Sequence, residues 1–255
     1  MAKAVTRMTI DDALHFNDED RAEITAGYEP HMRDARTRGI PSMGIGRVYP
    51  VAQVDISVAP FQVPGHWALI AGIDLGWDHP TAAVQMAWDR DADVVYIGAC
   101  YRKKEKTPIE HCVALKPWGE WLPWAWPVDA TQHDKRSGGT LAQDYRSHGL
   151  HMLGTHAQFP DKGTSVEAGI MEILTRMQTQ RLKVFAHLAD WFEEFNMYHR
   201  KERPDGTSKI HKFKDDLMDA TRYGIMMLRY AEPADLHGPD AGEVLRTGGN
   251  PVTGY

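Results

Sequence analysis

The sequence predicts one α/β domain built on a mixed sheet, in which antiparallel hairpin strands are followed by parallel strands and helices flank the sheet. Two observations predict this class. The first three strand-like runs follow one another in hairpin order, whereas the rest of the domain alternates short strands with helices. In addition, 42% of the 255 residues are hydrophobic and 25% are charged, which is typical of a globular protein with a buried core.

The predicted domain spans residues 66–230, and its elements are recognised from apolar runs and capping signals. Strands are predicted where apolar residues alternate or run continuously, at 67–74, 81–88, 94–100, 151–155 and 182–185, with one more ending at Asp129. Helices are predicted after capping residues, at 140–149, 165–178, 189–199 and about 214–230. A hairpin around residues 204–206 is predicted to precede the last helix.

The segments that flank this domain are predicted to bury little surface. Residues 1–65 combine short capped helices with a breaker-rich loop, and we interpret them as an arm or linker. Prolines interrupt the alternating residues 51–64, so any strand there is expected at the edge of a sheet. Residues 231–255 are rich in Gly, Pro and Asp and are predicted to form a flexible C-terminal tail.

Composition excludes several classes of protein. The 29 basic and 35 acidic residues give a net charge of -6, so contact with nucleic acid would depend on a local basic patch. Cys100 and Cys112 are too few for a disulfide framework and form no CxxC motif, which predicts a reducing compartment. No apolar run reaches the ~18 residues of a membrane span, and we expect a soluble, cytoplasmic protein.

Carboxylates gather at three places where predicted elements begin or end. Asp74 and Asp129 end predicted strands, and Asp215, Asp216 and Asp219 open the last predicted helix within an arc of about 100°. Ligand sites in α/β sheets lie beyond the carboxyl ends of strands, where the first two acids are expected. Each acid alone is also consistent with a turn or cap residue, and the pair that opens the helix complements the helix dipole.

Together, these acids indicate a site for hard cations. Clustered carboxylates repel one another and raise their own pKa values unless cations neutralise them. Oxygen ligands without Cys or His partners suit Mg²⁺ or Mn²⁺, and none of the 13 histidines has zinc-site spacing. Two such ions ~4 Å apart activate a water and stabilise the leaving oxygen when a phosphodiester is hydrolysed.

Seven stretches of the chain carry a resemblance to a known family. They lie at residues 8–15, 33–42, 72–83, 128–130, 166–170, 181–185 and 215–223. Gly-Ile-Asp-Leu-Gly-Trp-Asp-His-Pro-Thr-Ala-Ala at 72–83 and Asp-Asp-Leu-Met-Asp-Ala-Thr-Arg-Tyr at 215–223 are examples, and the latter is the most specific. In these stretches the sequence resembles the C-terminal nuclease portion of phage terminase large subunits, which are DNA-packaging motor proteins.

The resemblance implies a ribonuclease-H-like fold and a metal-dependent endonuclease that cuts double-stranded viral DNA during genome packaging, using two Mg²⁺ or Mn²⁺ ions. It implies the portal protein and the small terminase subunit as partners, and the cytoplasm of the infected bacterial host as location. Asp74, Asp129 and an acid of the helix cluster would bind the metals. We favour Asp215, closely followed by Asp216, and expect Asp219 to orient a ligand or a metal-bound water. Asp78 would contact a metal through water, or else cap the turn before Pro80.

A basic segment precedes the acidic helix. Between residues 199 and 214, six Lys or Arg residues stand against two acids, which gives a local charge of six minus two, or +4. The residues predicted to contact the DNA backbone are Arg200, Lys201, Arg203, Lys209 and Lys212. The alternative is a solvated turn with ordinary surface charges.

Two other functions compete with the nuclease. An actin-like or sugar-kinase ATPase also has a first strand ending in Ile-Asp-Leu-Gly, but it predicts no acidic cluster opening the final helix. A non-catalytic module that docks on the portal would carry a vestigial acid site. The chain has no GxxxxGK[ST] phosphate-binding loop, so we expect it to hold the nuclease portion of a terminase without the ATPase.

Overall fold

A computed structural model of the protein describes residues 8–28, 33, 36–39, 46–131, 139–202 and 208–237. The main sheet has the strand order β1-β6-β4-β3-β2-β5, and β9 pairs with the start of β2. The strands are β1 (Ser57–Val58), β2 (Ala68–Asp74), β3 (Thr81–Asp89), β4 (Val94–Lys103), β5 (Trp124–Ala125), β6 (Leu182–Phe185) and β9 (Glu232–Pro233). Within the described ranges, no helix is both long enough and apolar enough to cross a membrane.

Antiparallel pairing of β2, β3 and β4 forms the centre of the sheet. The runs are apolar because both faces are covered, and Asp74 is the one residue of β2 that is not fully buried. Parallel strands flank this centre: β6 pairs with β4, and β5 pairs with β2. The predicted mixed sheet and the predicted hairpin across residues 89–93 are therefore confirmed.

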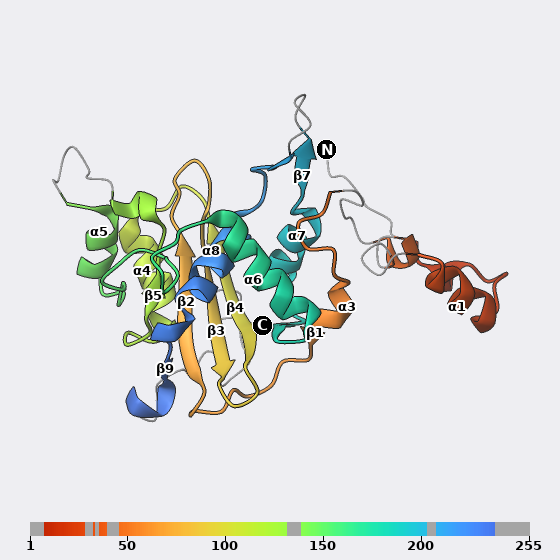
Figure 1. Cartoon of the computed structure of the whole chain (residues 1–255), viewed down its shortest axis with the longest axis horizontal. Helices are drawn as coiled ribbons and strands as arrows, with labels where there is room; N and C mark the ends of the chain where they lie inside the picture. Colours follow the sequence, from red (N-terminus) through yellow and green to blue (C-terminus); the bar gives the residue numbers. More distant parts are fainter. Residues whose placement is uncertain are drawn as a thin grey trace.

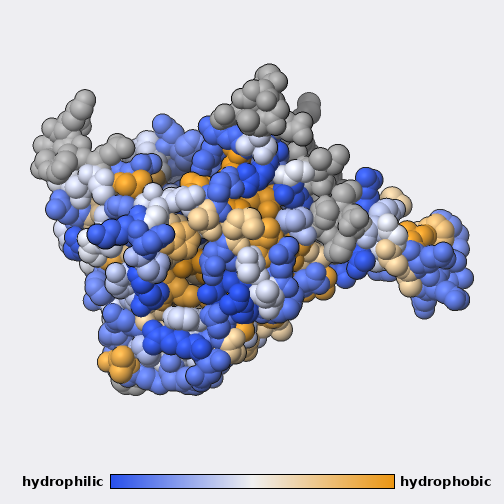
Figure 2. Space-filling view, viewed as in Figure 1, coloured by the Kyte–Doolittle hydropathy of each residue, from blue (hydrophilic) through white to orange (hydrophobic). Residues whose placement is uncertain are grey.

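The helices cover the sheet and its edges (Figure 1). They are α1 (Asp18–Ala26), α3 (Gln53–Ile56), α4 (Pro108–Leu115), α5 (Leu141–Ser147), α6 (Val166–Gln178), α7 (Ala189–Met197) and α8 (Asp216–Met226). Helix α8 packs on β2 and β3, and α6 lies beside it, whereas α1 projects away from the sheet. On this face, hydrophilic residues surround the apolar residues that are visible over α6 and α8 (Figure 2).

Two glycines let α8 approach the sheet closely. A Cβ atom on Gly72 would lie 2.0 Å from the carbonyl oxygen of Ala220, and one on Gly224 would lie 1.9 Å from the Cε of Met86. Both distances are far inside van der Waals contact. Only glycine fits at position 72, where the clash is with backbone, whereas a larger residue at position 224 would displace the flexible end of Met86. This close packing brings the first turn of α8 to the carboxyl end of β2.

The segment before residue 66 contributes more to the fold than the sequence suggests. Strand β1 lies at the edge of the sheet, as expected, and pairs with β6. However, apolar side chains of the same segment are buried in the main core, namely Val48, Tyr49, Val51, Ile56 and Val63. The prediction of an arm is therefore wrong for the part from Val48 to Val63, because these scattered apolar residues are buried only by long-range packing.

Other boundaries also differ from the predictions. Residues 231–237 are not a free tail, because β9 pairs with β2 and both Ala231 and Ala234 are buried. The strand predicted at 151–155 is reduced to an isolated bridge between Trp124 and Met152. Asp129 follows β5 in a 3-10 turn, η3 (Val128–Thr131), instead of ending the strand itself.

The helices and the hairpin in the second half agree well with the sequence. Thr140 and Ser165 accept hydrogen bonds from backbone N–H groups and cap α5 and α6. The predicted hairpin is formed by β7 (Arg200–Glu202) and β8 (Ser208–Ile210). The last helix is shorter than predicted and is followed by the 3-10 turn η4 (Leu228–Tyr230).

Candidate functional site

An open pocket of about 450 Å³ lies where the carboxyl end of β2 meets the start of α8. Six carboxylates line it, with one lysine, one histidine and a few neutral residues: Asp74, Leu75, Gly76, Trp77, Asp78, His79, Asp129, Lys212, Asp215, Asp216, Asp219 and Tyr223. All the acids singled out in the sequence therefore face one space.

Three elements bring these acids together. Asp74 is the last residue of β2, and β5 runs parallel beside β2, so the turn that carries Asp129 lies at the same edge of the sheet. The N-terminus of α8 is held from α7, because the carboxylate of Glu194 accepts the backbone N–H of Leu217 at 2.6 Å. Glu194 is itself buried and paired with Arg102 at 2.6 Å. The helix start is thereby fixed beside the strand end.

The carboxylates of the pocket repel one another. Burial raises the pKa of Asp74 well above its ordinary value, and repulsion from Asp219 and Asp216 raises it further. Burial and the neighbouring Asp215 likewise raise the pKa of Asp216. A bound cation would relieve this repulsion, so the pocket has the electrostatic character of a cation site.

Two basic side chains already neutralise part of the cluster. The Nζ of Lys212 lies 2.9 Å from Oδ2 of Asp215 and 2.8 Å from Oδ2 of Asp219. Arg222 donates to the other oxygen of Asp219 at 2.9 Å from its Nη2. Both oxygens of Asp219 are therefore paired with basic side chains. The ammonium group of Lys212 contacts the acid cluster and is not free to bind a DNA phosphate.

Asp215, the helix acid favoured from the sequence, is not among the acids of α8 that act most strongly on Asp74. The acids that raise the pKa of Asp74 most strongly are Asp219 and then Asp216. The reason is local: Asp215 occupies the N-cap position with φ -121° and ψ 5°, so a helical 100° step does not describe where its side chain points. Its carboxylate pairs with Lys212 instead.

Asp78 and Asp129 are exposed at the rim of the same pocket. The loop after β2 is closed by Thr81, whose hydroxyl donates to the Gly76 carbonyl at 2.9 Å and accepts the Gly76 N–H at 3.2 Å. Thr81 therefore closes this loop, the role considered as the alternative for Asp78. Asp78, in the same loop, lines the pocket.

The donor set fits a hard divalent cation. It consists of carboxylate oxygens with one exposed histidine and no thiol, which suits Mg²⁺ or Mn²⁺ better than zinc. In the described residues, no three His, Cys, Asp or Glu side chains converge closely enough to enclose one ion by themselves. An ion here would therefore keep several waters, as Mg²⁺ usually does.

The basic residues predicted to contact DNA have different surroundings in the structure. Arg200 donates two hydrogen bonds to Glu167, at 2.8 and 2.5 Å, which ties β7 to the start of α6. Lys201 and Lys209 are exposed and lie directly opposite each other in the β7–β8 register. Arg203 lies outside the described residues. Sequence reasoning assigned no role to Arg222 or Tyr223, although both fall within the most specific motif.

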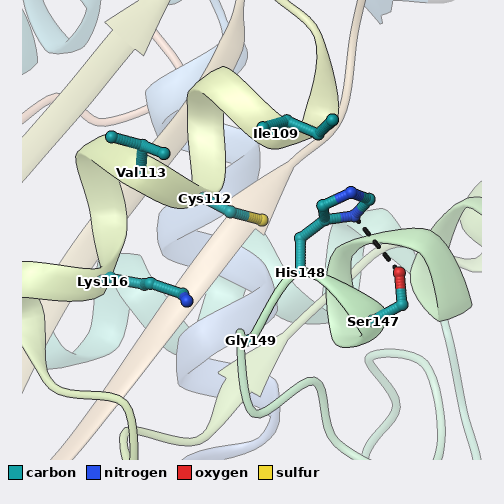
Figure 3. A pocket seen from close by; sticks show the side chains of 7 residues that line it. All are labelled: Ile109, Cys112, Val113, Lys116, Ser147, His148 and Gly149. Atoms are coloured by element: carbon teal, nitrogen blue, oxygen red, sulfur yellow. Dashed lines mark hydrogen bonds between the residues drawn. The ribbon is translucent and has the colours of Figure 1, made fainter.

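A second pocket, of about 310 Å³, lies between α4 and the end of α5 (Figure 3). It contains the thiol of Cys112 and the pair Ser147 and His148, whose side chains lie 3.2 Å apart. Burial raises the pKa of Cys112 to about 11, so this thiol is protonated at neutral pH and is a poor nucleophile. The acidic pocket is therefore the stronger candidate for a catalytic site.

Comparison with known proteins identifies the family. A family profile described as the terminase RNase-H-like domain matches residues 71–228. The chain belongs to this terminase family. The predicted ribonuclease-H-like fold is thereby confirmed, and the family match favours the nuclease over the actin-like or sugar-kinase alternative.

Similar terminases include close relatives and one distant structure. The large terminase subunit of Salmonella phage P22 is 45% identical over 230 residues, covering 90% of this chain and 45% of that protein. The P22 large terminase nuclease domain matches with a TM-score of 0.68 at 43% identity, covering 75% of this chain and 97% of that one. The nuclease of thermophilic phage G20c, solved with bound magnesium, matches with a TM-score of 0.51 at 14% identity, covering 72% and 98%. That last similarity shows the fold alone.

Proposed function

We propose that this terminase domain is a metal-dependent endonuclease that cuts double-stranded viral DNA during genome packaging. The observation that carries the proposal is the convergence of six carboxylates on one pocket, with the half-buried Asp74 among them. The terminase family supports nuclease activity, and the G20c nuclease was solved with magnesium and with cobalt. The chain spans less than half of the P22 large subunit, so the role in packaging is part of the proposal.

In this proposal, Asp74, Asp129 and Asp216 hold two Mg²⁺ or Mn²⁺ ions, and Asp215 and Asp78 stand at the edge of the site. When bound, the ions supply an activated water and charge stabilisation at the leaving oxygen. The chain's own contribution is to position the carboxylates. Glu194 fixes the start of α8, and Arg222 with Lys212 neutralises Asp219, so that Asp216 is left to face Asp74.

Cleavage of supercoiled plasmid by the purified chain tests this function. We expect nicking with Mg²⁺ or Mn²⁺, no dependence on ATP and little preference for sequence, because the sequence carries no motif for a recognition helix in the major groove. EDTA should stop the reaction. A dependence on ATP would favour the kinase-like alternative, and the absence of cleavage with either metal would favour a non-catalytic docking module.

The β7–β8 hairpin is proposed to contact DNA phosphates through Lys201 and Lys209. Like charges directly opposite each other destabilise an antiparallel pair, and a polyanion relieves that repulsion. Arg200 is proposed to anchor the hairpin through Glu167 instead of contacting DNA. Arg203 keeps its predicted role as a DNA contact, whereas Lys212 is assigned to the acid cluster.

Paired substitutions in the hairpin separate these roles. Replacing Lys201 and Lys209 by Ala should weaken DNA binding for all sequences and reduce the slope of log affinity against log salt by roughly 0.9 for each phosphate that the protein no longer neutralises. Arg200→Ala and Glu167→Gln should resemble each other, since both release the same anchor. Fluorescence anisotropy over a salt series measures the slopes. If Arg200→Ala lowers the slope and Glu167→Gln does not, Arg200 binds a phosphate.

The proposed partners are double-stranded DNA, the portal protein and the small terminase subunit, and the proposed location is the cytoplasm of the infected host. The family supports a role in packaging in general. The portal and the small subunit enter by resemblance to terminase large subunits.

A further inference from the structure

Trp77 is an exposed tryptophan at the rim of the acidic pocket. All eight tryptophans lie in the described parts of the chain, and the other seven are buried or half-buried, whereas Trp77 is 57% exposed. It lies three residues beyond Asp74 and lines the same pocket. At this position the face of the indole is open to a molecule that enters the pocket.

The loop that carries Trp77 is built to hold it in place. Gly76 is tightly enclosed, since a Cβ atom there would lie 2.5 Å from the carbonyl oxygen of His79. The buried Thr81 makes two hydrogen bonds to Gly76 across the loop. Both constraints fix the backbone on either side of Trp77. The backbone that carries the indole is therefore held in a defined loop three residues from Asp74.

The negative charge of the pocket disfavours the binding of DNA, so a contact that does not depend on charge would help to hold the strand. Six carboxylates line it, whereas its one lysine, Lys212, is engaged with Asp215 and Asp219. A DNA strand that enters this pocket is repelled by the surroundings until cations bind. Stacking of a base on an aromatic ring is insensitive to that charge, and it is tolerant of sequence because every base has a π-face.

We propose that Trp77 stacks on a nucleobase of the DNA strand next to the phosphate that is cut. The inference rests on the proposed nuclease function and extends it to the form of the substrate. In an intact duplex both faces of each base are covered by neighbours. Stacking on Trp77 therefore requires a base step that is locally opened, and opening costs least at a mismatch or in a single strand.

Binding of two matched oligonucleotides tests the proposal. One is a single strand of thymidines, and the other has the same length and phosphates but abasic sites in place of bases. In the presence of Ca²⁺, the wild type should bind the base-bearing strand about tenfold more tightly, the order of one base–aromatic stack. Trp77→Ala should bind both strands alike, and Trp77→Phe should keep part of the preference. Tryptophan fluorescence of the wild type should be quenched by the base-bearing strand only.

A matched control is Tyr230→Ala, which removes an exposed aromatic ring at the opposite end of β2 from Asp74 and should behave as the wild type. If Trp77→Ala keeps the full preference for bases, or if the wild type has none, the stacking role is overturned. If the stacking role is overturned in this way but the wild type still cleaves plasmid, the proposed nuclease function is retained. Conversely, a base preference that depends on Trp77 in a protein that cuts with neither metal would support stacking and reject the nuclease.

Discussion

Replacing Asp74 by asparagine should abolish metal-dependent cleavage while the fold is kept. Asp74 is the last residue of β2 and lines the acidic pocket together with the acids of α8. Loss of a side chain that only orients a metal ligand costs about 10–100-fold in activity. Loss of a direct ligand should cost more, because the ion that activates the water is lost with it.

The same substitution should stabilise the protein in the absence of divalent metal. Burial and the neighbouring acids raise the pKa of Asp74 in the folded state. Between its ordinary pKa and that raised value, the folded state binds the proton more tightly than the unfolded state does, so the free energy of unfolding falls as pH increases. Asparagine removes that loss at neutral pH. Each kcal/mol gained corresponds to a rise of about 2–4 °C in Tm for a chain of this size.

Scanning calorimetry with EDTA and with Mn²⁺ checks the stability change, and plasmid nicking checks the activity. Mn²⁺ should raise the Tm of the wild type, since a ligand that binds only the folded state at 100 times its Kd adds about 2.7 kcal/mol. It should raise that of Asp74→Asn much less. Wild-type turnover by the variant at saturating Mn²⁺, or a lower Tm in EDTA, would contradict the role of Asp74.

Asparagine substitutions along α8 should separate activity from stability. Asp216→Asn should be inactive with an unchanged or higher Tm, because burial and Asp215 make its charge unfavourable in the metal-free protein. Asp219→Asn should lower the free energy of unfolding by about 3–5 kcal/mol, since it leaves the buried guanidinium of Arg222 without its carboxylate partner. Asp215→Asn should keep partial activity, because its carboxylate is paired with Lys212.

Nicking rates over a Mn²⁺ titration and thermal unfolding of the same three variants decide between these roles. Wild-type activity in Asp216→Asn together with loss of activity in Asp215→Asn would show that the N-cap residue is the ligand. An Asp219→Asn protein as stable as the wild type would mean that Arg222 finds other partners.

Much of the fold could be predicted because local signals and long-range packing agree there. β2 and β3 are mostly apolar, and Thr140 and Ser165 cap their helices as the sequence indicates. The acids that line the pocket could be selected from the sequence because most of them stand close to where an element starts or ends, and such positions meet at one edge of a sheet. A pattern along the chain is enough to place residues of this kind.

Features that depend on which side chain meets which partner could not be predicted. Arg200 and Lys212 belong to a basic run, but Glu167 and Asp219 engage them in the fold. Asp215 falls on the acidic arc of an ideal helix, yet its N-cap backbone departs from that geometry. The core contribution of Tyr49 and its neighbours comes from packing against distant residues such as Phe195, which local periodicity does not reveal.

The central claim is that the acidic pocket binds divalent cations that hydrolyse DNA, and nicking of supercoiled plasmid tests it most directly. The wild-type chain, freed of metal and assayed without ATP, should show no nicking in EDTA and a rate that rises and saturates with Mn²⁺ or Mg²⁺. Cleavage that persists in EDTA, or no cleavage at any concentration of either metal, would contradict the account.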